Sequence, residues 1–242
     1  MPLYSEPRHA RLVGVGSLLE FLPSTHTGLV WGSGLMEDRA HPLPSVTPLA
    51  VRGPLTAERL GLTDEPAYGD PGILVARHLA RPRTSGRVVI VPHGHHRQNP
   101  SLARLVQRSG DAVRVVNVHQ RAAAALREIA AGSVVLTTSL HGLITADAYG
   151  IPAVWTTLDP PLTGGDFKFR DYEAAVTPGR SRYRPFADGV QLDELVADAW
   201  AADADRVTVL GDALEASLAV VPTMDAGQSP FPQGTLRALR RG

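Results

Sequence analysis

Histidine and arginine side chains follow several apolar segments of this sequence. His93 lies just after the run 88–91, His141 follows the run 134–136 across a short polar turn, and Arg52 directly follows the run 49–51. At the carboxyl ends of parallel strands, helix N-termini offer free N–H groups to anions. Histidine transfers protons near neutral pH, and arginine suits anionic oxygens. The pattern predicts proton transfer beside a bound anion.

The segment 134–155 is the clearest structural signal. Val134, Val135 and Leu136 show no polar alternation, which is typical of a strand covered on both faces. Ser139 can cap a following helix, and Gly150 can end it. The segment therefore predicts a strand, a turn that carries His141, a helix and a second strand.

Apolar runs and turn residues predict an α/β fold with two Rossmann-like parallel-sheet halves. The predicted strands are 12–15, 29–31, 49–51, a short run near 67, 88–91, 113–116, 134–136 and 153–155. The predicted helices are 18–22, 54–60, 102–108, 120–131, 192–201 and 212–220. The first half has little helix to cover its strands. This predicts a shortened N-terminal half whose apolar sheet is covered by a homodimer or by a crossing helix at 192–201.

These elements divide the chain into five segments. We expect an N-terminal half over 1–78, a linker over 79–86, a C-terminal domain over 87–190, C-terminal helices over 191–221 and a flexible tail over 222–242.

The composition limits the classes of partner. Among 242 residues, 24 basic side chains balance 24 acidic ones, so no global charge favours nucleic acid or a membrane surface. The chain has no cysteine, no apolar run of roughly 18 residues and no apolar signal segment near the N-terminus. We expect a cytoplasmic protein without a membrane span, disulfides or thiolate metal sites.

A resemblance to a known family covers roughly residues 11–173. The motifs that carry it are SLHGLITADAYGIP (139–152), LVGVGSLLEFL (12–22), VWGSG (30–34), VRGPLTAERLGL (51–62), YGDPGILV (68–75), VIVPHGHH (89–96) and FKFRDY (167–172). In this order they resemble the polysaccharide pyruvyl transferase family. The resemblance implies a GT-B-like fold and transfer of the enolpyruvyl group of phosphoenolpyruvate to sugar or glycan hydroxyls, as a cyclic ketal. It implies no cofactor and no obligatory metal.

The resemblance also gives roles to individual residues. His141 and His93 are the expected catalytic residues, and the expected substrate-binding residues are Arg52, Ser139, Gly142, Lys168, Arg170 and Asp70. A metal site built from His93 and His95 is the alternative for that histidine cluster, although no nearby carboxylate completes it.

Each of these residues has a structural alternative. Arg52 can pair with a carboxylate across the domain interface, His141 can be a hydrogen-bonding turn residue, and Asp70 can close an Asx-turn. Ser139 and Gly142 can be a cap and a turn. The alternation in FKFRDY predicts a strand with Lys168 and Arg170 on one face, which can be simply solvated. The arginines 180, 182 and 184 alternate in the same way and predict an exposed loop.

One family feature has no counterpart here. Family members usually begin with an Asn-x-Gly-Asp type loop, and this sequence starts near the following strand. Two further hypotheses therefore stand beside the transferase: a catalytically degenerate relative that binds a glycan or completes a complex, and a nucleotide-sugar glycosyltransferase of the same architecture.

Overall fold

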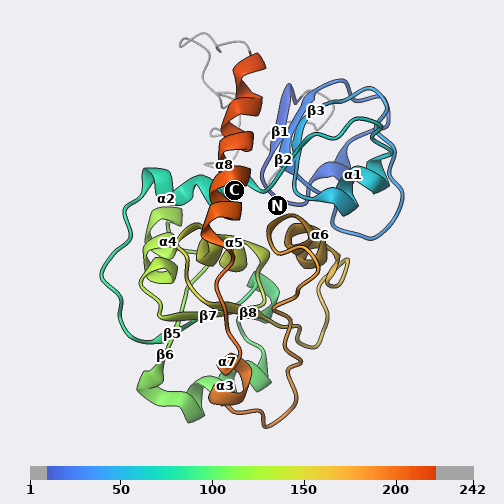
Figure 1. The fold of residues 1–242 in the computed structure, drawn as a ribbon. Coiled ribbons are helices and arrows are strands. Elements are labelled where there is room, and N and C mark those ends of the chain that lie inside the picture. The colour runs from blue at the N-terminus through green and yellow to red at the C-terminus, as the bar shows by residue number, and fades with distance from the viewer. Residues whose placement is uncertain (1–9, 222–242) are drawn as a thin grey trace, which may run out of the picture.

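A computed structural model of the chain describes residues 10–221 and shows an α/β protein with two halves. Each half contains a four-stranded parallel sheet (Figure 1). The first sheet consists of β1 (Leu12–Gly14), β2 (Leu29–Ser33), β3 (Thr47–Val51) and β4 (Ala67–Tyr68). The second consists of β5 (Val88–Val91), β6 (Val113–Val115), β7 (Val134–Thr137) and β8 (Ala153–Trp155). The predicted strands and the two parallel-sheet halves are confirmed, whereas the GT-B arrangement itself stays a prediction.

The helices connect these strands or follow them. They are α1 (Pro54–Leu60), α2 (Val75–His78), α3 (Pro100–Ser109), α4 (Ala122–Ala130), α5 (Leu140–Ala148), α6 (Phe167–Val176), α7 (Leu192–Val196) and α8 (Ala204–Ser217). Short 3₁₀ helices lie at Leu19–Phe21, Pro71–Leu74, Gly94–His96, Gly110–Ala112 and Leu218–Val220. Within residues 10–221, no helix combines the length and the apolar character that crossing a bilayer requires.

The first sheet has the sequential strand order β1-β2-β3-β4. Right-handed crossovers that all step in one direction leave their connections on one face of a sheet. The core on that face is accordingly built from the connections, through Leu19, Leu22, Leu35, Leu43 and Leu60. The opposite face has no connection of its own and needs another cover.

Helix α8 supplies that cover. It crosses from the second half to lie beside β3 and β4 (Figure 1), where Leu214 packs in a core with Ala50, and Leu214 O accepts a 3.0 Å hydrogen bond from Trp31 Nε1. A crossing helix was expected at 192–201, but α7 ends at Val196 and packs against β7 and β8 instead. The homodimer stays a prediction.

The second sheet has the order β6-β5-β7-β8, so the chain reverses its direction of progress between β5 and β7. Helices α3 and α7 cover one face, through a core that includes Ile90, Leu105 and Leu195. Helices α4, α5 and α6 lie on the other face, toward the first half (Figure 1). Crevices at such reversal points, beyond the strand carboxyl ends, are where open α/β sheets bind ligands.

Three sequence-based expectations were wrong. FKFRDY forms the start of α6 rather than a strand, because its aromatic residues at 167, 169 and 172 all find buried positions between the two halves. The helix expected at 212–220 begins at Ala204, where Asp203 caps it by accepting a 2.7 Å bond from Arg206 N. Arg182 lies fully buried instead of in an exposed loop. The expected tail, 222–242, lies outside the described residues.

Candidate functional site

The loops after β5 and β7 meet at the reversal point of the second sheet. The backbone N–H of His93 donates a 2.8 Å hydrogen bond to Thr138 Oγ1, which joins the two loops. Ser139 follows Thr138 as the N-cap of α5, and His141 is the second residue of that helix rather than part of a turn before it, as the sequence had predicted. The structure thus brings together His93, Ser139 and His141 at one sheet edge.

His93 is half-buried, and its ring is fixed by a local contact. Its Nδ1 accepts a 3.3 Å hydrogen bond from His95 N at the start of the 3₁₀ helix Gly94–His96. Burial, followed by the positive charge of Lys168 and the neighbouring histidines, lowers the pKa of His93 to about 4. The imidazole is therefore neutral at pH 7, and because Nδ1 accepts a hydrogen bond, its proton lies on Nε2, which can donate to an anion.

His141 faces an acid from the first half of the molecule. Its Nε2 lies 3.7 Å from Oδ2 of Asp70, while half of the His141 side chain is exposed and Asp70 is fully buried. The other carboxylate oxygen, Oδ1, accepts a 2.8 Å bond from Gly72 N, so the predicted Asx-turn is present. Within residues 10–221, Oδ2 has no hydrogen-bond partner. The carboxylate is thus held by its turn with one oxygen directed at the imidazole.

Ser139 and Gly142 differ from each other in what they offer. Ser139 is the N-cap of α5, but its side chain forms no capping bond. The N–H of Gly142 donates to Ser139 O at 3.0 Å, which leaves it unsuited to an anion. A Cβ at Gly142 would lie 2.4 Å from Thr137 Oγ1 and 3.0 Å from Val91 Cβ. The glycine therefore lies within α5 rather than in a turn, and it allows the helix to pack closely on β5 and β7.

Lys168 is a nearly buried cation on α6. Only 9 % of the residue is exposed, and its Nζ lies 5.8 Å from the centre of the Phe169 ring. In the part of the chain that the structure describes, it forms no ion pair. Burial, with a smaller contribution from the charge of Arg52, lowers its pKa to about 8. An ammonium group in this position favours a bound anion, because burying an uncompensated charge is costly.

Arg52 pairs with a carboxylate of the other half, which is the structural alternative that the sequence left open. The residue is fully buried, and its guanidinium donates to Asp171 Oδ2 at 2.8 Å, Ser17 Oγ at 2.7 Å and Leu35 O at 2.5 Å. Asp171 also accepts bonds from Thr56 N and Thr56 Oγ1. The expectation of an anion clamp at Arg52 is replaced by an ion pair that joins β3 to α6.

Arg170 is likewise engaged by carboxylates. Its guanidinium lies 3.0 Å from Asp38 Oδ2 and 3.1 Å from Asp166 Oδ1, and 46 % of the side chain is exposed. It projects toward the loop after β2 and away from the Lys168 position, because α6 is a helix.

The sequence did not reveal Asp171 as the partner of Arg52. A helical interpretation of FKFRDY would have placed Lys168 and Asp171 three residues apart on one face. Two motif glycines leave room for the Arg52–Asp171 pair. A Cβ at Gly34 would lie 2.4 Å from Arg52 Cζ, and a Cβ at Gly53 would lie 2.0 Å from Asp171 O. The motif glycines therefore mark where the backbone approaches this ion pair.

A second buried network stabilises the second half. Arg182 bonds Asp147 Oδ2 at 3.0 Å and Glu173 Oε1 at 3.0 Å, and Tyr172 Oη donates to Asp147 at 2.9 Å. Burial is the main cause that raises the pKa of Asp147 and holds that of Tyr172 well above its usual value. These charges are satisfied within the protein, so we assign the network to stability.

A metal ion has no evident site in the described chain. His93 and His95 lie side by side with their ring centres 5.0 Å apart. Across residues 10–221, no group of three or more histidine, aspartate or glutamate side chains is placed to hold a metal. The histidine cluster is better described as a hydrogen-bonding element of the loop after β5.

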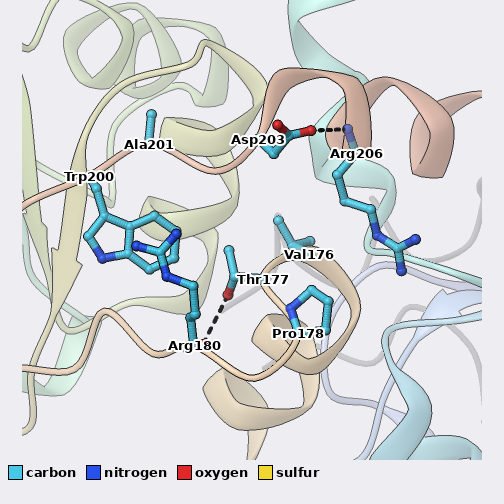
Figure 2. Close-up of a pocket in the computed structure, with 8 residues that line it drawn as sticks. All are labelled: Val176, Thr177, Pro178, Arg180, Trp200, Ala201, Asp203 and Arg206. Atoms are coloured by element: carbon cyan, nitrogen blue, oxygen red, sulfur yellow. Dashed lines mark hydrogen bonds between the residues drawn. The ribbon is translucent and has the colours of Figure 1, made fainter.

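A pocket of about 490 Å³ lies apart from these residues, between the end of α6 and the start of α8. Figure 2 shows its lining, in which the Arg180 guanidinium stacks 3.8 Å above the centre of the Trp200 ring. None of the eight residues that line it belongs to the predicted site. Its size therefore does not identify it as the site of the predicted chemistry.

Comparison with known proteins agrees with the sequence motifs. Residues 43–160 match the sequence model of the family described as polysaccharide pyruvyl transferase. The chain is also 33 % identical over 184 residues to the succinoglycan biosynthesis protein ExoV of Rhizobium meliloti (strain 1021). That match covers 72 % of this chain and 55 % of ExoV, so the chain spans about half the length of this relative. Together these matches place the chain in the polysaccharide pyruvyl transferase family.

Proposed function

We propose that the protein transfers the enolpyruvyl group of phosphoenolpyruvate to hydroxyls of a sugar or glycan during polysaccharide biosynthesis. The observation that carries this proposal is Lys168, a nearly buried cation without an ion-pair partner among the described residues. The charge of Lys168 helps to lower the pKa of His93, which lies just after the carboxyl end of β5. An anionic donor would compensate this charge.

Groups at the carboxyl end of the second sheet can complement the donor's phosphate and carboxylate. Lys168 contributes a point charge, and the N–H groups of Leu140 and His141 lie at the positive end of the α5 dipole. The neutral His93 offers a hydrogen-bonding ring, and the Ser139 hydroxyl is not engaged in capping. These groups favour the phosphoenolpyruvate transferase over a nucleotide-sugar enzyme, because they suit a small anion with two charged ends.

His141 is the proposed proton-transfer group, with Asp70 as its positioning residue. The Asp70 carboxylate lies 3.7 Å from Nε2 and orients the ring, and the half-exposed ring is open to a substrate. A histidine held in one orientation beside a substrate can transfer protons to and from it.

The reaction can be written with atoms and charges balanced. A proton adds to the methylene carbon of phosphoenolpyruvate, and an acceptor hydroxyl attacks the cation-like C2 and loses its proton. The bond between C2 and the phosphate oxygen then breaks, and the phosphate stays beside C2. A second hydroxyl attacks C2 and closes the ketal, its proton passes to the phosphate, and inorganic phosphate is released. His141 serves the first proton addition and accepts a hydroxyl proton afterwards.

The test measures phosphate release from phosphoenolpyruvate with succinoglycan-type oligosaccharides as acceptors. Lys168→Met should raise the KM for phosphoenolpyruvate at least tenfold, whereas Arg170→Met, two residues along α6, should leave it unchanged. Asp70→Asn should lower kcat by roughly tenfold, because the amide keeps the turn but lacks the charge. Absence of phosphate release with every acceptor, or equal KM values for the two α6 variants, would refute the proposal and favour a degenerate relative.

A further inference from the structure

A pocket of about 320 Å³ lies at the carboxyl-end edge of the second sheet. Its walls come from residues after β5 (Asn99 and Ser101), from the loop after β8 (including Thr157 and Asp159) and from the segment that carries Tyr183 and Asp188. Ligands of open α/β sheets bind at this edge. None of the predicted site residues lines the pocket.

The pocket wall is bonded to the loop that carries His93. His96 Nε2 lies 3.0 Å from Pro160 O, and Asn99 Nδ2 donates a 2.7 Å bond to Asp159 O. The ring centres of His93 and His96 are 6.1 Å apart. His96 therefore connects the pocket wall to His93 through one hydrogen bond and one ring contact.

Tyr183 gives the pocket a fixed aromatic surface. The residue is 38 % exposed, its ring packs on Trp155 with centres 4.7 Å apart, and its hydroxyl lies 3.2 Å from Thr157 Oγ1. Aromatic rings carry a negative face that attracts weakly positive C–H groups. A ring held in one orientation and left partly open is suited to the C–H face of a saccharide.

The polar groups around Tyr183 accept hydrogen bonds and repel anions. Within residues 10–221, the Asp159 carboxylate forms no ion pair and no side-chain hydrogen bond, and Asp188 pairs only with the exposed Arg104 at 3.0 Å. Carboxylate oxygens accept bonds from hydroxyl groups, which a saccharide supplies in number. The pocket of Figure 2 differs, because Arg180 and Arg206 line it. The pocket at Tyr183 is therefore suited to a neutral polyhydroxyl ligand.

We infer that this pocket binds a neutral saccharide unit of the acceptor, with Tyr183 beneath the sugar ring and Asp159 accepting from its hydroxyls. The inference rests on the proposed function, since it assigns a place to the acceptor of that reaction. The carboxylates of Asp159 and Asp188 disfavour phosphoenolpyruvate here, so the acceptor pocket is separate from the donor site at Lys168.

The experiment is saturation-transfer NMR of the full chain with cellotetraose and β-1,4-galactotetraose, in the absence of phosphoenolpyruvate. We expect at least one of these neutral oligosaccharides to bind, and Tyr183→Ala and Asp159→Asn to weaken that binding at least fivefold each. Tyr183→Phe should weaken it less, since the ring remains. Phe21→Ala is the matched control, because Phe21 is an exposed aromatic residue of the first half and should not affect binding.

Two results would overturn the inference. One is that neither oligosaccharide binds; the other is that binding is unchanged in both Tyr183→Ala and Asp159→Asn. Far-ultraviolet circular dichroism of each variant confirms that it is folded. Phosphate release is measured separately. Saccharide binding without turnover refutes the proposed function and retains the pocket. Turnover with an acceptor KM that neither variant changes retains the proposed function and refutes the pocket.

Discussion

Two aspartate side chains, one facing an arginine and one facing a histidine, join the halves of this molecule, and the two pairs differ in how many of their hydrogen-bonding positions are filled. In the Arg52–Asp171 pair both side chains are fully buried, and Thr56 occupies the remaining positions on the carboxylate. In the His141–Asp70 pair the imidazole is half exposed, and the facing oxygen of Asp70 lacks a hydrogen bond within the described chain. Both pairs join the first half to a helix of the second half.

The difference separates a stabilising contact from a chemical one. A buried ion pair whose hydrogen-bonding positions are all filled cannot bind a substrate, and its loss lowers the free energy of unfolding. A pair with a long contact and an open ring can change protonation during a reaction. The family motifs contain both pairs, so only the three-dimensional arrangement distinguishes their roles.

The largest effect is expected at the buried pair. Asp171→Ala should lower the free energy of unfolding by about 3–5 kcal/mol, because it leaves the Arg52 charge buried without a partner. Asp171→Asn should cost less, since an amide oxygen can still accept from Thr56 N. Urea unfolding followed by circular dichroism measures both changes. A loss below about 1 kcal/mol in Asp171→Ala would contradict the assignment of this pair to stability.

The open pair should respond in activity instead. His141→Ala should lower turnover by roughly 10²-fold or more, which corresponds to about 2.7 kcal/mol of the barrier. Its unfolding free energy should change by less than about 0.5 kcal/mol, because a half-exposed residue at the start of a helix buries little apolar area. The measurement is phosphate release at saturating phosphoenolpyruvate. Turnover within a few-fold of wild type would leave His141 a structural residue.

Much of the fold could be predicted, because runs such as Val88–Val91 and Val134–Thr137 signal buried strands directly. The N-terminus of α5 and the turn at Asp70 were predictable from local chemistry as well. The role of Arg52 was not, since its partner Asp171 is 119 residues away and belongs to a segment whose alternation favoured a strand. Tertiary packing of the aromatic residues in α6 overrides that local pattern. The cover of the first sheet was missed for a similar reason, because α8 contains the β-branched run 207–209.

Lys168 lies near Arg52 and His93, and its pKa predicts a pH dependence. Its pKa of about 8 means that the ammonium is present below pH 8 and is lost above it. The KM for phosphoenolpyruvate should therefore rise by up to roughly tenfold for each pH unit above 8, as the protonated fraction falls. Lys168→Met should abolish this limb of the profile. A wild-type KM that is constant between pH 7.5 and 9.5 would contradict a role for the ammonium in donor binding.

The same group makes an opposite prediction for stability. The pKa of Lys168 is lower in the folded chain than its ordinary value of 10.5, so the unfolded chain binds more protons between about pH 8 and 10.5. The contribution of Lys168 to stability should accordingly become more favourable as pH rises through this window. The difference in unfolding free energy between wild type and Lys168→Met, measured across this pH range, isolates the contribution of Lys168 from that of the other ionisable groups. Activity and stability thus move in opposite directions over one pH range.

The smallest effect is expected at Arg170, which provides the surface counterpart of the buried pair on the same helix. Its contacts with Asp38 and Asp166 at 3.0 and 3.1 Å are partly exposed, and such pairs contribute about 0–1 kcal/mol. Arg170→Ala should therefore change the unfolding free energy by less than about 1 kcal/mol, with a difference that shrinks at high salt. It should leave both the KM for phosphoenolpyruvate and kcat unchanged. A tenfold rise in that KM would instead assign Arg170 to the donor site. It would also show that a cation of α6 can bind the donor even when carboxylates pair with it, so that solvent exposure, and not the lack of a partner, marks the functional cations.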